Sequence, residues 1–128
     1  MAESIYKVLD RALWQLALES GKFLGAEIDI KDGYIHFSSA YQLVETVRKH
    51  FAGREDLLVV EFDSDDFGDS LRWEVSRGGD QFPHLYASLD TALAQATYEL
   101  PLSPGGQHDF SGISGFVKQS PPTRGTNL

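Results

Sequence analysis

The chain has 128 residues, no cysteine and a formal net charge of −8. This length suits one domain with one core, and the lack of cysteine excludes disulfides, thiolate nucleophiles and Cys-ligated zinc. The negative charge opposes bulk binding of nucleic acid but is compatible with a local nucleotide site. The apolar runs are too short to cross a bilayer, and the N-terminus has no signal-peptide pattern, so we expect a cytoplasmic protein without a membrane partner.

The first predicted elements are a strand and a helix. Residues 4–9 follow the alternation of a strand, and Asp10 is placed to cap a helix that runs to about Ser20 and ends at Gly21. The helix is expected to pack on the core through an apolar face made of Leu13, Trp14, Leu16, Ala17 and Leu18.

A polar residue then precedes a second helix. Residues 22–33 have no clear period and end in a turn. Residues 34–37 predict a short strand, and Ser38 or Ser39 is expected to cap a helix that runs to about Phe51. His36 therefore lies immediately before a helix N-terminus, where unpaired amides attract anions.

The second half of the chain predicts mainly strands. Residues 56–63 form the strongest one and are expected to be central and buried. An acidic loop leads to residues 71–75, which alternate so that Leu71, Trp73 and Val75 should face the core. Residues 82–87 predict a further strand. Residues 92–100 form a last element, either a strand or a helix.

The domain organisation follows from this order and from composition. Residues 1–102 are expected to form a single globular domain, and residues 103–128 a Ser-, Pro- and Gly-rich tail that is partly disordered. About two helices and five or six short strands occur without regular alternation. This order favours an α+β fold over a doubly wound parallel sheet.

No standard catalytic motif is present, and no residue spacing typical of a metal site occurs, so no metal is expected. His36 shares a strand face with Tyr34 and Ser38, and it is either a cleft residue or a surface histidine before a cap. His84 shares a face with Phe82 and Tyr86, which suits ring stacking. The alternative is packing in an edge strand that begins at Pro83.

Three charged residues near the Gly78-Gly79 turn are further candidates. Arg72 and Glu74 share a strand face and either form an exposed ion pair of small energetic value or serve a ligand. In the second interpretation, Glu74 accepts a hydrogen bond from a ribose or acts as a base. Arg77 lies beside the turn and is a candidate phosphate contact.

Several short segments occur together in one order. They are Tyr6-Lys7, Trp14, residues 33–38 (GYIHFS), residues 56–59 (DLLV), residues 72–74 (RWE) and residues 82–86 (FPHLY). In this combination the chain resembles the bacterial DUF952 family over residues 4–102. The resemblance implies an α+β fold similar to that of ADP-ribosyltransferases, in which about two main helices pack on two small, mostly antiparallel sheets that border a cleft.

The resemblance also implies a function class for this uncharacterised family. The expected cleft recognises a nucleotide (NAD, ADP-ribose or an RNA-terminal phosphate), and NAD would be a substrate if the protein is a transferase. The implied catalytic residues are His36, Glu74 and His84, and the implied ligand-binding residues are Lys7, Ser38, Arg72, Arg77 and Tyr86. The alternative is a noncatalytic module that binds a protein or a small metabolite. Lys7 stands where the family often has His, and Ala87 where it often has Gly, which favours this alternative.

Overall fold

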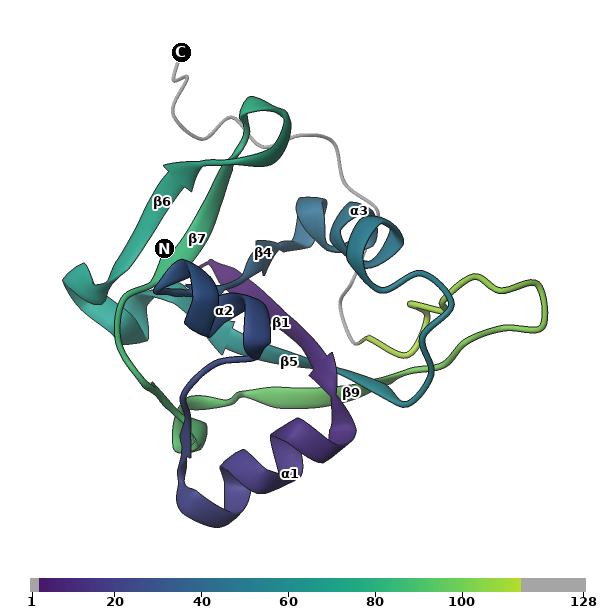
Figure 1. Ribbon diagram of the computed structural model, residues 1–128, viewed down its shortest axis with the longest axis horizontal. Coiled ribbons are helices and arrows are strands. Elements are labelled where there is room, and N and C mark those ends of the chain that lie inside the picture. The colour runs from purple at the N-terminus through teal and green to yellow at the C-terminus, as the bar shows by residue number, and fades with distance from the viewer. Residues whose placement is uncertain (1–2, 114–128) are drawn as a thin grey trace.

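The computed structural model describes residues 3–113, apart from the Arg77 side chain. These residues form a mixed α+β fold in which all strand pairs are antiparallel (Figure 1). The largest sheet has the strand order β4 (Ser38–Ser39), β1 (Ser4–Asp10), β5 (Leu57–Asp63) and β9 (Ala96–Leu100). A second sheet has the order β3 (Ile35–His36), β7 (Gln81–Leu85) and β6 (Leu71–Val75). A third joins β2 (Lys22–Phe23) to β8 (Leu89–Asp90).

The helices are short and lie mostly in the first half of the chain. The α-helices are α1 (Arg11–Ser20), α2 (Glu27–Asp32) and α3 (Ala40–His50). Three 3-10 segments are η1 (Ser64–Ser70), η2 (Arg77–Gly79) and η3 (Thr91–Leu93). In Figure 1, α1 and α3 lie on opposite sides of the strands β1 and β5.

The alternation of β1 and β5 divides the core in two. These strands pair along their whole length. Ile5 and Phe62 belong to one cluster, in which α1 and the β3–β7–β6 sheet pack, whereas Val8 and Val59 belong to a second cluster with α3. Because successive side chains of a strand point to opposite faces, the largest sheet is covered on both sides. The prediction of a central, buried strand at residues 56–63 is therefore confirmed.

Local sequence signals located most of the other elements. Residues 4–9, 71–75 and 82–87 correspond to β1, β6 and β7, and α1 ends at Gly21 in the left-handed conformation. Ser39 caps α3 through a hydrogen bond accepted from the Gln42 amide, and the Gln42 side chain accepts one from the Ser39 amide. Residues 96–100 form strand β9, so the helical alternative for the last element is wrong.

Some predicted faces are wrong. Leu16 and Leu18 of α1 are 62% and 53% exposed, because the stripe that packs on the sheet is centred on the buried Trp14 and Ala17. Val75 is 67% exposed, since the end of β6 extends past the core toward the turn at η2. The unperiodic segment 22–33 contains β2 and α2, which local signals did not predict.

The chain beyond residue 102 begins with ordered contacts. Leu102 forms an isolated β-bridge with His108, and Ile113 is buried in the cluster under α3. The prediction of a partly disordered tail falls largely on residues 114–128, which lie outside the described residues.

Candidate functional site

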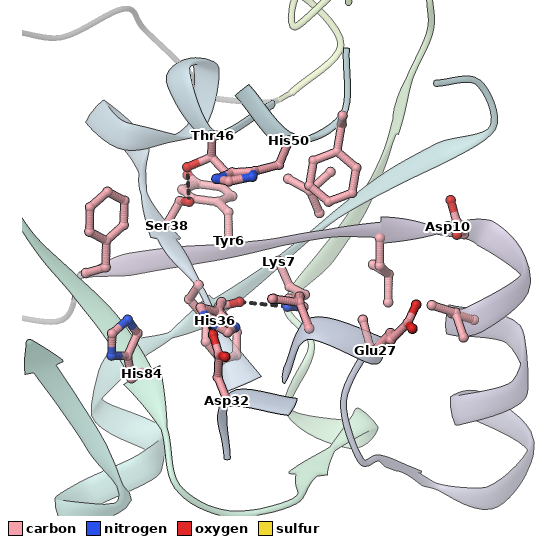
Figure 2. Close-up of a pocket in the computed structure, with 18 of the residues that line it drawn as sticks. Tyr6, Lys7, Asp10, Glu27, Asp32, His36, Ser38, Thr46, His50 and His84 are labelled. Carbon is pink, nitrogen blue, oxygen red and sulfur yellow. Dashed lines mark hydrogen bonds and ion pairs between the residues drawn. The ribbon is translucent and has the colours of Figure 1, made fainter. Parts of the chain in front are cut away.

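A cleft of about 880 Å³ runs along one edge of β1. Strand β4 pairs with β1 only at Ile5 and Tyr6. Among the described strands, β1 has no partner on this edge beyond Tyr6, and residues from Lys7 to Asp10 line the cleft instead. In the view of Figure 2, the labelled side chains on one side of β1 include Lys7, Asp32, His36 and His84, and those on the other side include Ser38, Thr46 and His50.

The two candidate histidines meet in this cleft. His36 of β3 is the direct register partner of His84 of β7, and their ring centroids are 5.5 Å apart. Directly opposed residues of an antiparallel pair place their side chains on the same face of the sheet. Tyr34 packs against both rings, stacked on His84 at 4.1 Å and tilted against His36 at 4.7 Å. Residues distant in sequence therefore form one aromatic and titratable cluster.

The Glu74 carboxylate contacts the ring of the buried His84. His84 Nδ1 lies 2.8 Å from Glu74 Oε1, and the Tyr86 hydroxyl donates to the same oxygen at 2.7 Å. Burial lowers the pKa of His84, an effect that the nearby charge of His36 reinforces and the hydrogen bond to Glu74 opposes. In the neutral ring, Nδ1–H donates to Glu74, so the lone pair is on Nε2. His84 lines the cleft, whereas Glu74 contacts it only through His84.

His36 contacts two carboxylates of α2. Its Nδ1 lies 2.6 Å from Asp29 Oδ1, and its Nε2 lies 3.0 Å from Asp32 Oδ2. The backbone amide of His36 also donates to Asp29, at 3.0 Å. The position of this histidine is therefore set mainly by α2.

Asp29 is the most highly bonded carboxylate of the site. It is 2% exposed, and its oxygens lie 3.0 and 2.9 Å from Lys7 Nζ. Burial favours a higher pKa for Asp29, but the hydrogen bond to His36 and the charge of Lys7 outweigh it and lower the pKa to about 2. Burial lowers the pKa of Lys7, which the Asp29 charge opposes. The pair is thus an ionised, buried contact between β1 and α2.

Local sequence explains how Asp29 reaches this position. The Ala26 amide donates to Asp29 Oδ2 at 2.8 Å, which ties the carboxylate to the start of α2. The preceding Gly25 has φ of 124°, in the region that favours glycine, and a Cβ there would lie 2.9 Å from the Asp29 Cβ. Only glycine fits this approach without a shift of α2.

The other predicted ligand-binding residues lie in different surroundings. Ser38 is 3% exposed, lines the cleft and shares a 2.8 Å hydrogen bond with the Thr46 hydroxyl. The Lys7 ammonium also lines the cleft, and it donates to the His36 carbonyl at 2.9 Å as well as to Asp29. Both residues line the same cleft as His36 and His84, but in the view of Figure 2 Ser38 lies on the other side of β1 from Lys7, His36 and His84.

Arg72 and Tyr86 lie outside the cleft lining. The Arg72 guanidinium lies 5.0 Å from the centroid of the Tyr86 ring, and Tyr86 also packs against Tyr34. Of the two interpretations of Arg72 and Glu74, the exposed ion pair does not form among the described residues, because Glu74 binds His84 and Tyr86 instead. Arg77 belongs to η2, between β6 and β7, and its side chain lies outside the described part of the structure.

Sequence reasoning missed the acidic half of the site. Asp29 and Asp32 lie in the segment that has no clear period, and neither follows a recognisable motif. Two weak signals were present. Asp32 lies four residues before His36, and Asp29 follows Ala26 by three residues, as the polar residue of a capping box does. Phe51 and Arg54 line the cleft at its Asp10 end, and no sequence motif marked them as site residues.

The match to a family model decides the relationship. The model described as "Protein of unknown function (DUF952)" matches residues 8–96. The chain belongs to the DUF952 family. The crystal structure of protein CC0527 from Caulobacter crescentus is 39% identical, with a TM-score of 0.80 over 83% of this chain and 93% of that one. The solution NMR structure of CC0527 gives a TM-score of 0.74 at 39% identity, over 81% and 90% of the chains. Among curated proteins, none matches this DUF952 chain.

Within residues 3–113, no group of three or more His, Asp or Glu side chains is arranged to hold a metal ion. No helix of the described chain is long and apolar enough to span a membrane.

Proposed function

We propose that this DUF952 protein recognises a nucleotide in the cleft beside β1, with NAD, ADP-ribose or an RNA-terminal phosphate as the ligand class. The observation that carries the proposal is the pairing of His36 with His84 in register on the wall of a cleft of about 880 Å³. That volume lies within the roughly 300–1,000 Å³ typical of small-molecule sites. A mostly apolar wall with a few convergent polar groups is also typical of such sites.

The length of the cleft suits an extended ligand. Its lining follows β1 from Tyr6 to Asp10, which at about 3.3 Å per residue is a path of roughly 13 Å. The histidines lie toward the Tyr6 end, since Tyr6 pairs with Ser38, and Arg54 contacts Asp10 at the other end. The rings of Tyr6 and Phe82 at the first end offer stacking surfaces for a base or nicotinamide.

An ADP-ribosyltransferase-like transferase is the corresponding reaction class. In this proposal His36 and Ser38 hold a ribose or phosphate, and the Ser38 hydroxyl, which bonds Thr46 among the described residues, has a second lone pair for this purpose. His84, oriented by Glu74, directs the nucleophile toward an oxocarbenium-like centre. Arg72 and Tyr86 support Glu74 rather than contacting the ligand.

The test is a titration of the isotopically labelled protein with NAD, ADP-ribose and a 2′-phosphorylated RNA oligonucleotide, followed by amide NMR shifts. We expect saturable shifts centred on His36, Ser38 and His84, and much weaker shifts with unphosphorylated adenosine. Tyr98, on strand β9 of the largest sheet and outside the cleft lining, serves as an internal control. If all three ligands leave the amides around both histidines unchanged, the proposal fails.

A noncatalytic binding module is the second candidate, and the open edge of β1 favours it. Strand edges bind extended peptides by adding a strand. Lys7, at the position where the family often has His, is fully engaged by Asp29 and the His36 carbonyl. We expect peptide capture without turnover if this candidate is right. His36→Ala and His84→Ala would then abolish capture, whereas turnover by the parent protein that both variants lose would reject the module.

A further inference from the structure

The main chain of β1 bonds to its two neighbours through alternate residues. Just beyond one end of the strand, the Arg11 amide donates to the Asp56 carbonyl at 3.0 Å. Just beyond the other end, the Ser64 amide donates to the Glu3 carbonyl at 2.9 Å. Successive residues of a strand direct their N–H and C=O groups to opposite edges, so the odd-numbered residues of β1 point toward β5. The even-numbered residues point to the edge where β4 and the cleft lie.

Two of these even-numbered residues have main-chain groups without a partner. Tyr6 pairs with Ser38 of β4, and this is the last pair on that edge. Val8 lines the cleft and is 6% exposed, and among residues 3–113 neither its N–H nor its C=O has a hydrogen-bond partner. The Asp10 N–H is in the same position. Because buried main-chain groups nearly always have a partner, the edge from Val8 to Asp10 is suited to bind another main chain.

The buried ion pair of Lys7 and Asp29 keeps this edge open. If the chain before Ser38 continued along β1, His36 would lie opposite Val8 and exchange main-chain bonds with it. Instead, the His36 amide donates to Asp29 at 3.0 Å, and the His36 carbonyl accepts from Lys7 Nζ at 2.9 Å. The main chain of His36 is thus satisfied without β1, and β3 pairs with β7. Val8 is left without the partner that a longer β4 would supply.

The two walls beside this edge differ in chemistry. On the α2 side, the cleft is lined by the carboxylates of Glu27 and Asp32 and by the apolar Ile28. Glu27 is exposed, and within the described part of the chain its carboxylate has no hydrogen bond or ion pair. On the α3 side, the lining includes the ring of Phe51. The α2 wall therefore suits basic side chains, and the α3 wall offers an apolar contact.

The balance of charge in the cleft also favours a basic partner. Among the described lining residues, the Lys and Arg side chains are already bonded to carboxylates. Lys7 Nζ lies 2.9 Å from Asp29, and Arg54 donates to both oxygens of Asp10 at 2.6 and 2.8 Å. The chain as a whole has a formal net charge of −8. A partner segment with Lys or Arg complements this charge, whereas an acidic segment is repelled.

We propose that an extended, basic segment of a partner protein adds to β1 as an antiparallel strand beside residues 8–10. This inference rests on the binding-module candidate and names its partner. Antiparallel addition continues the orientation of β4, and the other described strand pairs have the same orientation. Because lining residues from α2 and α3 lie on either side of β1, the recessed edge admits a single segment and not the edge of another sheet (Figure 2).

The register of the added strand follows from the faces of β1. Val8 belongs to the apolar cluster under α3, whereas Lys7 points to the other face and contacts Asp29 of α2. In an antiparallel bonded pair, the two opposed residues exchange both main-chain bonds and lie on the same face. The partner residue opposite Val8 therefore faces α3 and supplies the main-chain bonds. Its two neighbours face α2, where Glu27 and Asp32 line the cleft.

The experiment uses the full chain and the peptide acetyl-Val-Lys-Val-Lys-Val-Lys-amide, in which the valines match the α3 face and the lysines the α2 face. Calorimetric titration measures binding, and NMR measures amide hydrogen exchange. We expect saturable binding that weakens with added salt. The Val8 and Asp10 amides should exchange faster than those of Lys7 and Leu9 in the free protein, because the latter bond to β5. The peptide should slow exchange at Val8 and Asp10 only.

Two N-methylated peptides test strand addition itself. Methylation of the valine amides removes the donors that face Val8 and should weaken binding by roughly 10-fold or more, whereas methylation of the lysine amides alters only the far edge and should be tolerated. A third peptide, with Glu in place of each Lys, should bind far more weakly. Glu27→Lys should weaken binding of the basic peptide by roughly 5- to 10-fold. Glu19→Lys is the matched control, because Glu19 is exposed on α1 and lies outside the cleft lining.

Each contrary result overturns a stated part of the inference. Strand addition is overturned if both methylated peptides bind equally well or equally poorly, and the antiparallel register is overturned if only methylated lysines weaken binding. Equal affinities of Glu27→Lys and Glu19→Lys overturn the basic partner. Slow exchange at Val8 without peptide overturns the inference in favour of this chain itself, or of a second copy if the slowing depends on protein concentration.

These outcomes are separate from those for the proposed function. If the peptides do not bind, the inference fails, while shifts caused by nucleotides at His36 and His84 still support the nucleotide site. Capture of a different protein that leaves exchange at Val8 unchanged also overturns the inference, and it leaves the binding-module candidate standing.

Discussion

Replacement of Asp29 by Asn tests whether the buried ion pair with Lys7 holds α2 against β1. Asn preserves the shape of the side chain but removes its charge, which leaves the Lys7 ammonium 5% exposed and without its counterion. Removing one partner of a buried pair costs about 3–5 kcal/mol, because an uncompensated charge stays in the protein. A domain of this size has a total stability of about 5–15 kcal/mol. The loss should therefore lower the melting temperature by roughly 10–20 °C.

The magnitude follows from how completely the pair is buried. The side chains of Lys7 and Asp29 are 7% and 1% exposed, so solvent screens the interaction little. Asn still offers an oxygen to the Ala26 or His36 amide, so the effect reports mainly on charge. A double variant, Lys7→Met with Asp29→Asn, removes both charges and should recover at least half of the loss.

The assay is guanidinium unfolding at pH 7, followed by the fluorescence of the buried Trp14. Arg48→Ala is the control. The Arg48 side chain is 69% exposed and pairs with Glu45 on the surface of α3, where such a pair adds little stability. The reasoning is refuted if Asp29→Asn unfolds within about 1 kcal/mol of the parent, or if the double variant loses as much as the two single variants together.

Three further results are expected. Gly25→Ala should destabilise the fold by about 2 kcal/mol or more, because φ is 124° and the new Cβ meets α2, whereas Gly105→Ala, in open space, should change little. Lowering the pH from 7.5 to 5.5 should reduce stability, since unfolded histidine takes a proton near its ordinary pKa of 6.5 while the folded pKa of His84 is lower. His84→Gln should flatten this dependence in chemical unfolding. Burial and the hydrogen bond to Glu61 raise the pKa of Tyr98 to about 12, so Glu61→Gln should lower it in an ultraviolet titration.

The loss of stability at acid pH gives independent information on the buried contact between Asp29 and Lys7. The folded pKa of Asp29 is about 2, below its ordinary value of 3.8. The contribution of Asp29 is thus fully present above about pH 4 and is lost as the pH falls toward 2. Asp29→Asn should lose less stability over this window than the parent protein, even though it is less stable at neutral pH.

The sequence by itself determined the local elements and part of the histidine cluster. The continuous apolar run of residues 57–60 predicted the buried strand β5. The predicted face shared by Tyr34 and His36 lies opposite Ile35 and Phe37, which are buried in the core. Ser39 capped α3 as a short-range signal predicted. These outcomes depend on residues within one or two turns of each other, so periodicity and capping chemistry suffice to predict them.

Only the tertiary structure decided what surrounds those histidines. Asp29 contacts Lys7 because α2 packs against β1, and nothing in the unperiodic segment 22–33 indicates this approach. Glu74 contacts His84 rather than Arg72 because β6 and β7 pair in a register that places Arg72 opposite His84 and Glu74 diagonal to it. The exposure of Leu16 has a similar cause, since the sheet covers only one stripe of α1. Strand register and helix docking are set by contacts between distant segments. These contacts, and not the local sequence pattern, place Glu74 beside His84 and place Asp29 and Asp32 beside His36.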